Sequence, residues 1–160
     1  MFFYLAGCLL VGFFIAEIAS VSTTLYLHRG TTHRAITFHP IIEFLFQFRL
    51  WLSTGINRKE WEAVHLCHHA HADEEGDPHS PLIYGFWKVQ LFNAFFYWRA
   101  TKDPKVLWYA KHRQPVGFEK LVSRIWGSGV LGLIIGVSLA CYIFGLKTGL
   151  LISSFHALLY

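Results

Sequence analysis

Hydrophobic residues gather in two long segments near the ends of this chain. The first, residues 2–27, has one charged residue, Glu17, and is long enough to cross a bilayer as a helix. The second, residues 127–146, has no charged residue at all. A turn is expected at residues 147–149, followed by part of a third span from residue 150. The pattern predicts an all-α integral membrane protein with these spans, in a single domain of residues 1–160 that is expected to be incomplete.

Two shorter apolar segments lie between the predicted spans. Residues 41–56 would reach only about 24 Å as a helix at about 1.5 Å per residue, too short for two crossings. A helix is expected to start at His39-Pro40, since proline is favoured in the first turn. Residues 82–98 are rich in aromatic side chains, which favours headgroup depth. Both segments are therefore predicted to be helices at the membrane interface.

The composition supports a membrane protein. Apolar residues make up 54% of the chain and charged residues only 15%, which is unusual for a soluble domain. Of the fourteen Lys and Arg, all but Lys147 lie between Arg29 and Arg124, which predicts that residues 28–126 face the cytoplasm. These basic residues form no dense cluster interleaved with polar residues that could contact bases, so nucleic acid is not expected as a partner.

A polar stripe follows one face of the first apolar segment. Glu17, Ser20, Thr24 and His28 share that face at helical spacing and are expected to point into the helix bundle. An acid inside a membrane is a functional candidate, so Glu17 is predicted to have a functional role. The alternative is a protonated carboxyl group bonded to Ser20 or to a neighbouring helix.

Five histidines form two clusters at chelating spacings, His28 with His33 and His65 with His68 and His69. In an α-helix, His68 and His69 fall about 60° and about 40° to either side of His65, so they share a face but diverge. His28 and His33 should diverge further. The pattern predicts two metal ions, each bound by imidazoles from both clusters. Imidazole suits Fe, Zn, Cu and Ni, and the lack of paired cysteines argues against structural zinc; a zinc site, or histidines that bind nothing, stays the alternative.

The motifs HRGTTHR, HLCHHA and DPHSP, within residues 27–87, resemble the first two histidine boxes of the membrane-bound fatty acid desaturases, in the delta-9 acyl desaturase branch. The resemblance implies two Fe ions, with O2 as co-substrate. It also implies an acyl-CoA or other acyl-lipid substrate, and an electron donor such as ferredoxin, rubredoxin or cytochrome b5. Trp61 and Glu17 become candidates for the tunnel wall and for support of the metal. His79 is not among the usual ligands of the family, and the acidic turn at residues 73–78 is expected to be a solvated loop.

Two departures from the family affect the interpretation. Family members supply a third HxxHH box after the last span, which this chain lacks, so the sequence is expected to be truncated. Ala63, Val64 and Leu66 surround His65 where animal acyl-CoA desaturases carry an Arg-Asp pair, so the acyl carrier stays open. The predicted function is an O2-dependent fatty acyl desaturase with its histidines on the cytoplasmic side of a multi-pass membrane protein. The alternatives are a membrane hydroxylase or ketolase using the same boxes, and an inactive membrane scaffold.

Overall fold

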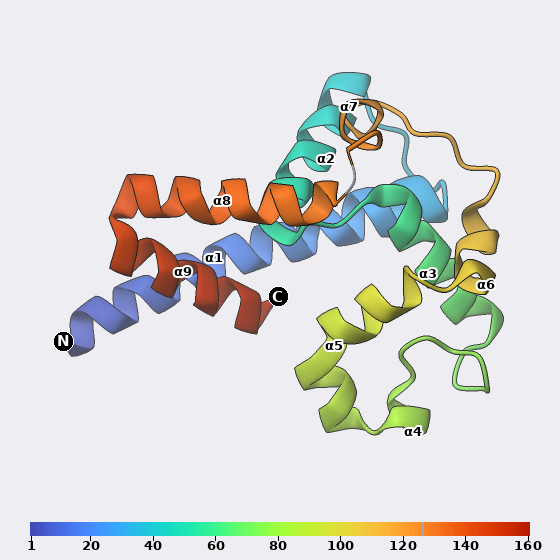
Figure 1. Cartoon of the computed structure of the whole chain (residues 1–160), viewed down its shortest axis with the longest axis horizontal. Helices are drawn as coiled ribbons and strands as arrows, with labels where there is room; N and C mark the ends of the chain where they lie inside the picture. Colours follow the sequence, from blue (N-terminus) through green and yellow to red (C-terminus); the bar gives the residue numbers. More distant parts are fainter. Residues whose placement is uncertain (126) are drawn as a thin grey trace.

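The fold is all-helical, as predicted: in the computed structural model, which describes residues 1–125 and 127–160, these residues form helices and loops without strands (Figure 1). The elements are α1 (Phe2–Ser22), η1 (Thr23–Thr32), α2 (Pro40–Thr54), α3 (Arg58–Ala70), α4 (Pro81–Tyr84), α5 (Phe86–Ala100), α6 (Pro104–Leu107), η2 (Trp108–Ala110), α7 (Glu119–Val122), α8 (Ser128–Phe144) and α9 (Leu146–Leu159). The helices α1, α2, α8 and α9 pack into one bundle. At the far end of the long first helix, α3 packs against η1, α6 and η2 pack on α3, and α4 and α5 lie further away (Figure 1).

The first apolar segment forms one continuous helix. Helix α1 runs into η1 without a break, and together they span Phe2–Thr32, 31 residues with a mean hydropathy of 2.1 in the most apolar part. Among the described residues this is the one helix long and apolar enough to cross a membrane. Helices α8 and α9 are apolar but have 17 and 14 residues, or about 25 Å and about 21 Å at about 1.5 Å per residue.

The connection between α8 and α9 lies two residues earlier than the sequence suggested. Gly145 forms the turn with φ of 82°, a conformation that glycine adopts without steric cost. Residues 147–149 are helical, so the predicted turn there is wrong. Gly149 serves packing instead, because a Cβ atom at this position would overlap the backbone of Cys141 in α8.

Helix α8 also approaches α2 closely through glycines. A Cβ atom on Gly132 or Gly136 would overlap the carbonyl oxygen of Trp51 or Leu52. The Trp51 indole N–H donates a hydrogen bond to the carbonyl oxygen of Ser128, 2.6 Å away. The GxxxG spacing of residues 132–136 therefore marks close helix packing, as expected from the sequence.

Small residues, rather than polar ones, define the buried face of α1. Ala16 and Ala19 are fully buried, and a Cβ atom on Gly12 would come within 2.7 Å of the Cβ atom of Phe155 in α9. Glu17 and Thr24 are exposed, so the expectation that the polar stripe points into the bundle is wrong for these two residues, whereas Ser20 and His28 are half-buried. Because most of the α1 surface is apolar, the small residues decide its orientation by allowing α9 to come near.

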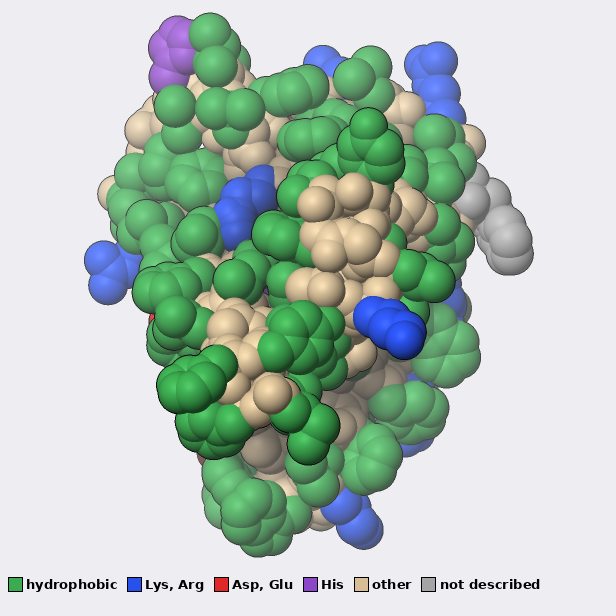
Figure 2. All heavy atoms as spheres, turned by 90° about the vertical axis from the view of Figure 1, so that its left-hand side faces the viewer, with side chains coloured by type: hydrophobic (Ala, Val, Ile, Leu, Met, Phe, Trp, Pro, Cys, Tyr) green, Lys and Arg blue, Asp and Glu red, His purple; other side chains and the backbone are tan. Residues whose placement is uncertain are grey.

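The outer surface of the bundle is strongly apolar. Figure 2, which looks at the end holding the N-terminus of α1 and the α8–α9 turn, shows mostly hydrophobic side chains with scattered Lys and Arg. Phe2, Phe14, Ile134 and Tyr142 are each more than half exposed. Contiguous apolar surface of this kind is a poor match to water and suits a lipid environment.

The two segments predicted to lie at the membrane interface are helical, as expected, and their place at the interface stays a prediction. Helix α2 starts at Pro40, and the His39 ring caps it by accepting a hydrogen bond from the Ile41 N–H at 3.3 Å. The aromatic-rich segment is divided into α4 and α5, because Gly85 adopts φ of 91° between them. Helix α5 has a kink at Phe92.

Candidate metal centre

Helix α3 carries the second histidine cluster on its partly open face. Asn57 starts the helix by accepting hydrogen bonds from the N–H groups of Lys59 and Glu60. Ala63, Val64 and Cys67 form the buried side against α6 and η2. His65 and His69 are four residues apart, so ordinary α-helical geometry brings their rings together. Their Nε2 atoms lie 3.0 Å apart.

The first histidine cluster depends on a different backbone geometry. In η1 the hydrogen bonds join residues five apart, as in a π-helix, and the His33 N–H donates to the His28 carbonyl oxygen at 3.0 Å. Residues five apart then lie on the same side of the helix, and the two rings have centroids 4.5 Å apart. The expectation that His28 and His33 diverge is therefore wrong. The Thr31 and Thr32 hydroxyl groups both donate to the Leu27 carbonyl oxygen at this turn.

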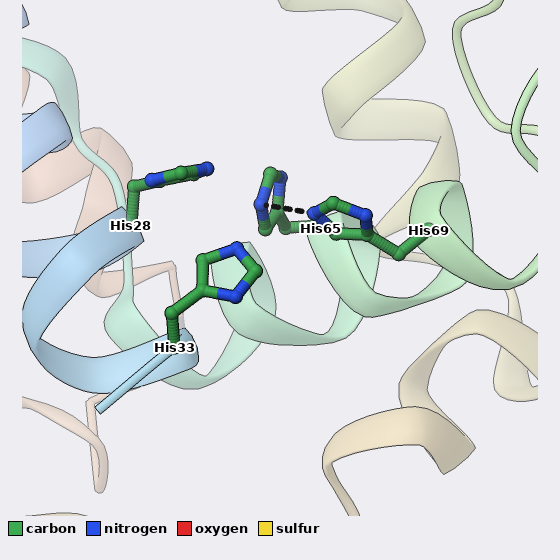
Figure 3. A group of neighbouring side chains, drawn as sticks. All are labelled: His28, His33, His65 and His69. Carbon is green, nitrogen blue, oxygen red and sulfur yellow. Dashed lines mark hydrogen bonds between the residues drawn. The ribbon is translucent and has the colours of Figure 1, made fainter. Parts of the chain in front are cut away.

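The rings of His28, His33, His65 and His69 point toward one another from η1 and α3 (Figure 3). One ring nitrogen from each lies within 4.8 Å of the other three. For metal–nitrogen bonds of about 2.1 Å, two ligands at a right angle are about 3 Å apart, close to the 3.0 Å between the Nε2 atoms of His65 and His69. The four convergent imidazoles therefore form a group that could hold a single transition-metal ion after a small closure of the rings.

Within the four-histidine cluster, the His65 ring has a strongly lowered pKa. Burial lowers the pKa of the His65 ring, and the neighbouring His69, His28 and His33 rings lower it further, to about 3. The imidazole is therefore neutral at physiological pH, the form in which histidine binds metals. Trp61 stacks on the same ring, with centroids 4.6 Å apart and planes tilted by 19°. Trp61 therefore contacts one of the candidate ligands, and its role beside a metal or in a tunnel wall stays a prediction.

His68 is not part of the four-histidine cluster. Its Nδ1 atom lies 2.8 Å from Oδ2 of Asp77, and its ring stacks on His79 with centroids 4.8 Å apart. Asp77 is 1% exposed, so the expectation of a fully solvated acidic loop is wrong at this residue. Burial alone would raise the pKa of the Asp77 carboxyl group, but hydrogen bonds from the N–H groups of His79 and Asp73 and from His68 bring it below its usual value.

The structure thus separates the five predicted histidines into four and one. His28 and His33 do not fork toward two ions but join the same cluster as His65 and His69. His68 lies with Asp77 and His79 in a second group whose candidate ligand atoms are within 4.8 Å of one another. Glu17, the remaining candidate, is exposed on α1.

A chain of hydrogen bonds joins the two elements that carry the cluster. Tyr26 of η1 is fully buried, and its hydroxyl accepts a hydrogen bond from the Gln47 amide of α2. The Gln47 amide oxygen accepts from the Glu119 N–H at 3.0 Å, and the Glu119 carboxylate accepts from Arg58 of α3 at 3.0 Å. Sequence reasoning missed these residues, because nothing in their spacing connects positions so far apart.

Helix α3 is also held by buried charges. Arg58 pairs with Glu62 at 2.8 Å and with Glu119 at 3.0 Å, and Arg113 pairs with Glu62 at 2.9 Å. Arg58, Glu62 and Glu119 are all less than 10% exposed. Although burial opposes the charge, the two carboxylates beside Arg58 raise its pKa above the ordinary value. The only local signal in the sequence is the i, i+4 spacing of Arg58 and Glu62.

Over the described residues, an all-helical fold with an exposed apolar surface, one candidate membrane-spanning helix and imidazoles converging from two elements defines the class of a candidate histidine-ligated metalloprotein. Among its relatives are plant proteins named as desaturases. The chain is 32% identical over 84 residues to the delta-9 desaturase-like 1 protein of Arabidopsis thaliana, covering 52% of this chain and 28% of the relative. It is 31% identical over 90 residues to delta-9 acyl-lipid desaturase 2 of the same plant, covering 56% and 29%.

A further relative is the acyl-CoA C20 delta5-desaturase of Anemone leveillei, 35% identical over 78 residues, covering 46% of this chain and 23% of the relative. These similarities confirm the resemblance to the fatty acid desaturases that the histidine spacings indicated. The matched part is less than a third of the length of each of these relatives. No family model matches the chain, and no solved structure matches it.

Proposed function

We propose that the chain is the histidine-bearing part of an O2-dependent fatty acyl desaturase with a di-iron centre. The observation that carries the proposal is the convergence of His28, His33, His65 and His69 from two elements. The names of the relatives support the same reaction, because all three are desaturases. Imidazole nitrogen is a suitable ligand for iron as well as for zinc and copper.

The two histidine groups and Trp61 would have separate roles in this reaction. The four-histidine cluster would hold one iron, and His68 would contribute to a second together with further ligands. Bound iron supplies the O2 activation that removes two hydrogens from an acyl chain. Two electrons from an external donor, such as a ferredoxin, a rubredoxin or cytochrome b5, and two protons complete the reduction of O2 to water. Trp61 covers one face of the His65 ring and so fixes its orientation and keeps water from it.

The membrane arrangement is part of the proposal. A multi-pass protein is supported by the apolar surface of α1, α8 and α9 and by the reversal of the chain at Gly145. The histidines would face the cytoplasm, because thirteen of the fourteen Lys and Arg lie in the same part of the chain, between Arg29 and Arg124. A protease site inserted in the exposed Glu74–Glu75 turn should be cut in inside-out vesicles and protected in right-side-out ones. The opposite pattern would contradict this orientation.

The substrate is proposed only as a class. An acyl chain esterified to CoA or to a lipid would approach the cluster from the bilayer, along the apolar surface of the bundle. Glu17 has no contact that assigns it a role, so its place beside the substrate stays a prediction. Its exposure on α1 lets it meet either lipid or a further part of the protein.

The proposal is tested by assaying membranes that contain the protein with labelled acyl substrates, reductant and O2, and by measuring bound iron. His65→Ala should abolish product formation and lower the iron content. His112→Ala is the matched control, because His112 is exposed and lies outside both histidine groups. An alcohol or ketone product in place of an alkene would favour the hydroxylase or ketolase. Unchanged iron content in His65→Ala would refute the ligand assignment, and iron-free wild-type protein would favour the scaffold.

A further inference from the structure

Asp77 is a buried carboxylate whose two oxygens are both engaged. Its Oδ2 atom lies 2.8 Å from Nδ1 of His68 and accepts the Asp73 N–H at 3.0 Å. Its Oδ1 atom accepts the His79 N–H at 3.0 Å. With the side chain fully shielded from solvent, the carboxylate is satisfied by donors of the protein rather than by water.

The loop between α3 and α4 is folded around this carboxylate. Asp73 adopts φ of 62° and Gly76 φ of 106°, which turn the chain back toward α3. Ser80 is fully buried; its hydroxyl donates to the Asp73 carboxylate at 2.6 Å and accepts from the Leu82 N–H at the start of α4. A Cβ atom on Gly76 would come within 2.9 Å of the His71 ring, so the turn needs glycine for space as well. These contacts hold Asp77 at one position.

We propose that Asp77 is a positioning residue that holds His68 in the tautomer with the proton on Nδ1, which leaves the Nε2 lone pair free to bind the second iron. An ionised carboxylate only accepts hydrogen bonds, so Nδ1 must donate. A neutral imidazole has one donor and one acceptor, and the acceptor is then Nε2. Carboxylate partners commonly orient metal-binding histidines in this way. The identity of the metal in this inference rests on the proposed function, whereas the tautomer of His68 does not depend on the proposed function.

His79 completes the support of the ring without acting as a ligand. The His68 and His79 rings stack with centroids 4.8 Å apart and planes tilted by only 24°. The lone pair of an imidazole nitrogen lies in the plane of its ring, so two nearly parallel stacked rings direct their lone pairs along their planes rather than toward one another. The competing arrangement is a separate metal site formed by His68, Asp77 and His79 themselves.

The direct test reads the tautomer of His68 in the wild-type chain. The full chain is labelled with nitrogen-15 in histidine, placed in lipid nanodiscs before iron is added, and the His68 signals are assigned by their loss in His68→Gln. A protonated Nδ1 and an unprotonated Nε2 are expected. A wild-type His68 with its proton on Nε2 overturns the proposal, and this measurement needs no variant of Asp77.

The variant test uses Asp77→Asn, with Glu74→Gln as the matched control. The new amide can donate to Nδ1 of His68 and so favour the opposite tautomer, whereas Glu74 is an exposed carboxylate of the same loop. Asp77→Asn should shift the His68 signals and weaken Fe²⁺ binding at the second site by about 10–100-fold. Binding by the four-histidine cluster should stay unchanged. Glu74→Gln should change neither signal nor affinity, and equal effects in the two variants overturn the proposal.

His79→Phe separates support of the ring from metal binding. Phenylalanine keeps an aromatic surface against His68 but removes both nitrogens. Unchanged Fe²⁺ stoichiometry supports the proposal, whereas loss of one bound ion would assign His79 as a ligand and overturn it. Because the tautomer is read without turnover, the orientation by Asp77 and the desaturase activity can fail independently of one another.

Discussion

The two elements that supply the four-histidine cluster reach a common site by different backbone geometries. In α3, His65 and His69 are four residues apart and meet through ordinary α-helical geometry. In η1, His28 and His33 are five apart and meet because the helix adopts the π hydrogen-bonding pattern. Ring centroids in both pairs are 4.5 Å apart. A chelating pair therefore depends on the spacing and the helix type together.

The same two elements are anchored by different forces. Helix α3 is fixed by buried charges, chiefly Arg58 with Glu62 and Glu119. Element η1 is fixed by the buried Tyr26 ring, which stacks on Phe46 of α2 with centroids 5.5 Å apart. Removal of one buried charge leaves its partners uncompensated, whereas removal of one neutral hydrogen bond costs much less. The two halves of the cluster should therefore differ in sensitivity to single substitutions.

Changing the spacing in each element should have the largest effect. An alanine inserted between Leu66 and Cys67 places His65 and His69 five apart in an α-helix, where they diverge by about 140°. Iron binding by the cluster should fall to background. Deletion of Thr31 places His28 and His33 four apart, a spacing that α-helical geometry tolerates, so the loss should be smaller. Bound iron per chain, measured after purification in detergent, checks both.

Circular dichroism provides the control for this pair of variants, since both should keep their helix content. Equal loss of iron in the two would contradict the idea that helix type and spacing act together. Full retention of iron after the insertion would show that α3 can itself adopt a π turn.

Arg58→Met should have the next largest effect. Methionine fills part of the space but leaves Glu62 and Glu119 buried without their shared cation, which should lower the free energy of unfolding by about 3–5 kcal/mol. Denaturant unfolding in detergent measures the change. Lys59→Met removes a neighbouring positive charge that forms no buried ion pair, and should change stability much less. Similar losses in the two variants would argue against the ion pairs as the anchor of α3.

Much of the fold could be predicted from local signals. The first apolar helix, the start of α2 at His39-Pro40 and the close packing at Gly132 and Gly136 all follow from residues near one another in the chain. The buried face of α1 was predicted wrongly, because its few polar residues do not mark the side that packs on α9, and the rest of its surface is apolar. The turn at Gly145 was missed because Gly149 lies four residues further on and equally suits a turn.

The candidate metal centre, too, could be predicted only in part from the sequence. The meeting of His65 with His69 follows from α-helical spacing alone, and Trp61 is one turn before His65. The meeting of His28 with His33 could not be predicted, because a change of hydrogen-bonding pattern leaves no mark in the spacing of two histidines. Asp77 was expected in solvent because its loop is rich in acids and glycine. The folded conformation of the loop, which the sequence does not reveal, places the Asp77 carboxylate within hydrogen-bonding distance of Nδ1 of His68.

Tyr26→Phe should have the smallest effect of the three changes. It removes the hydroxyl that accepts from Gln47 but keeps the ring against Phe46, so the loss should be about 1 kcal/mol. Tyr142→Phe is the matched control, because the Tyr142 side chain is 87% exposed. A loss for Tyr26→Phe as large as that for Arg58→Met would mean that the hydrogen-bonded chain through Gln47 and Glu119 acts as one unit. The contrast between a charged and a neutral anchor would then be replaced by a single shared one.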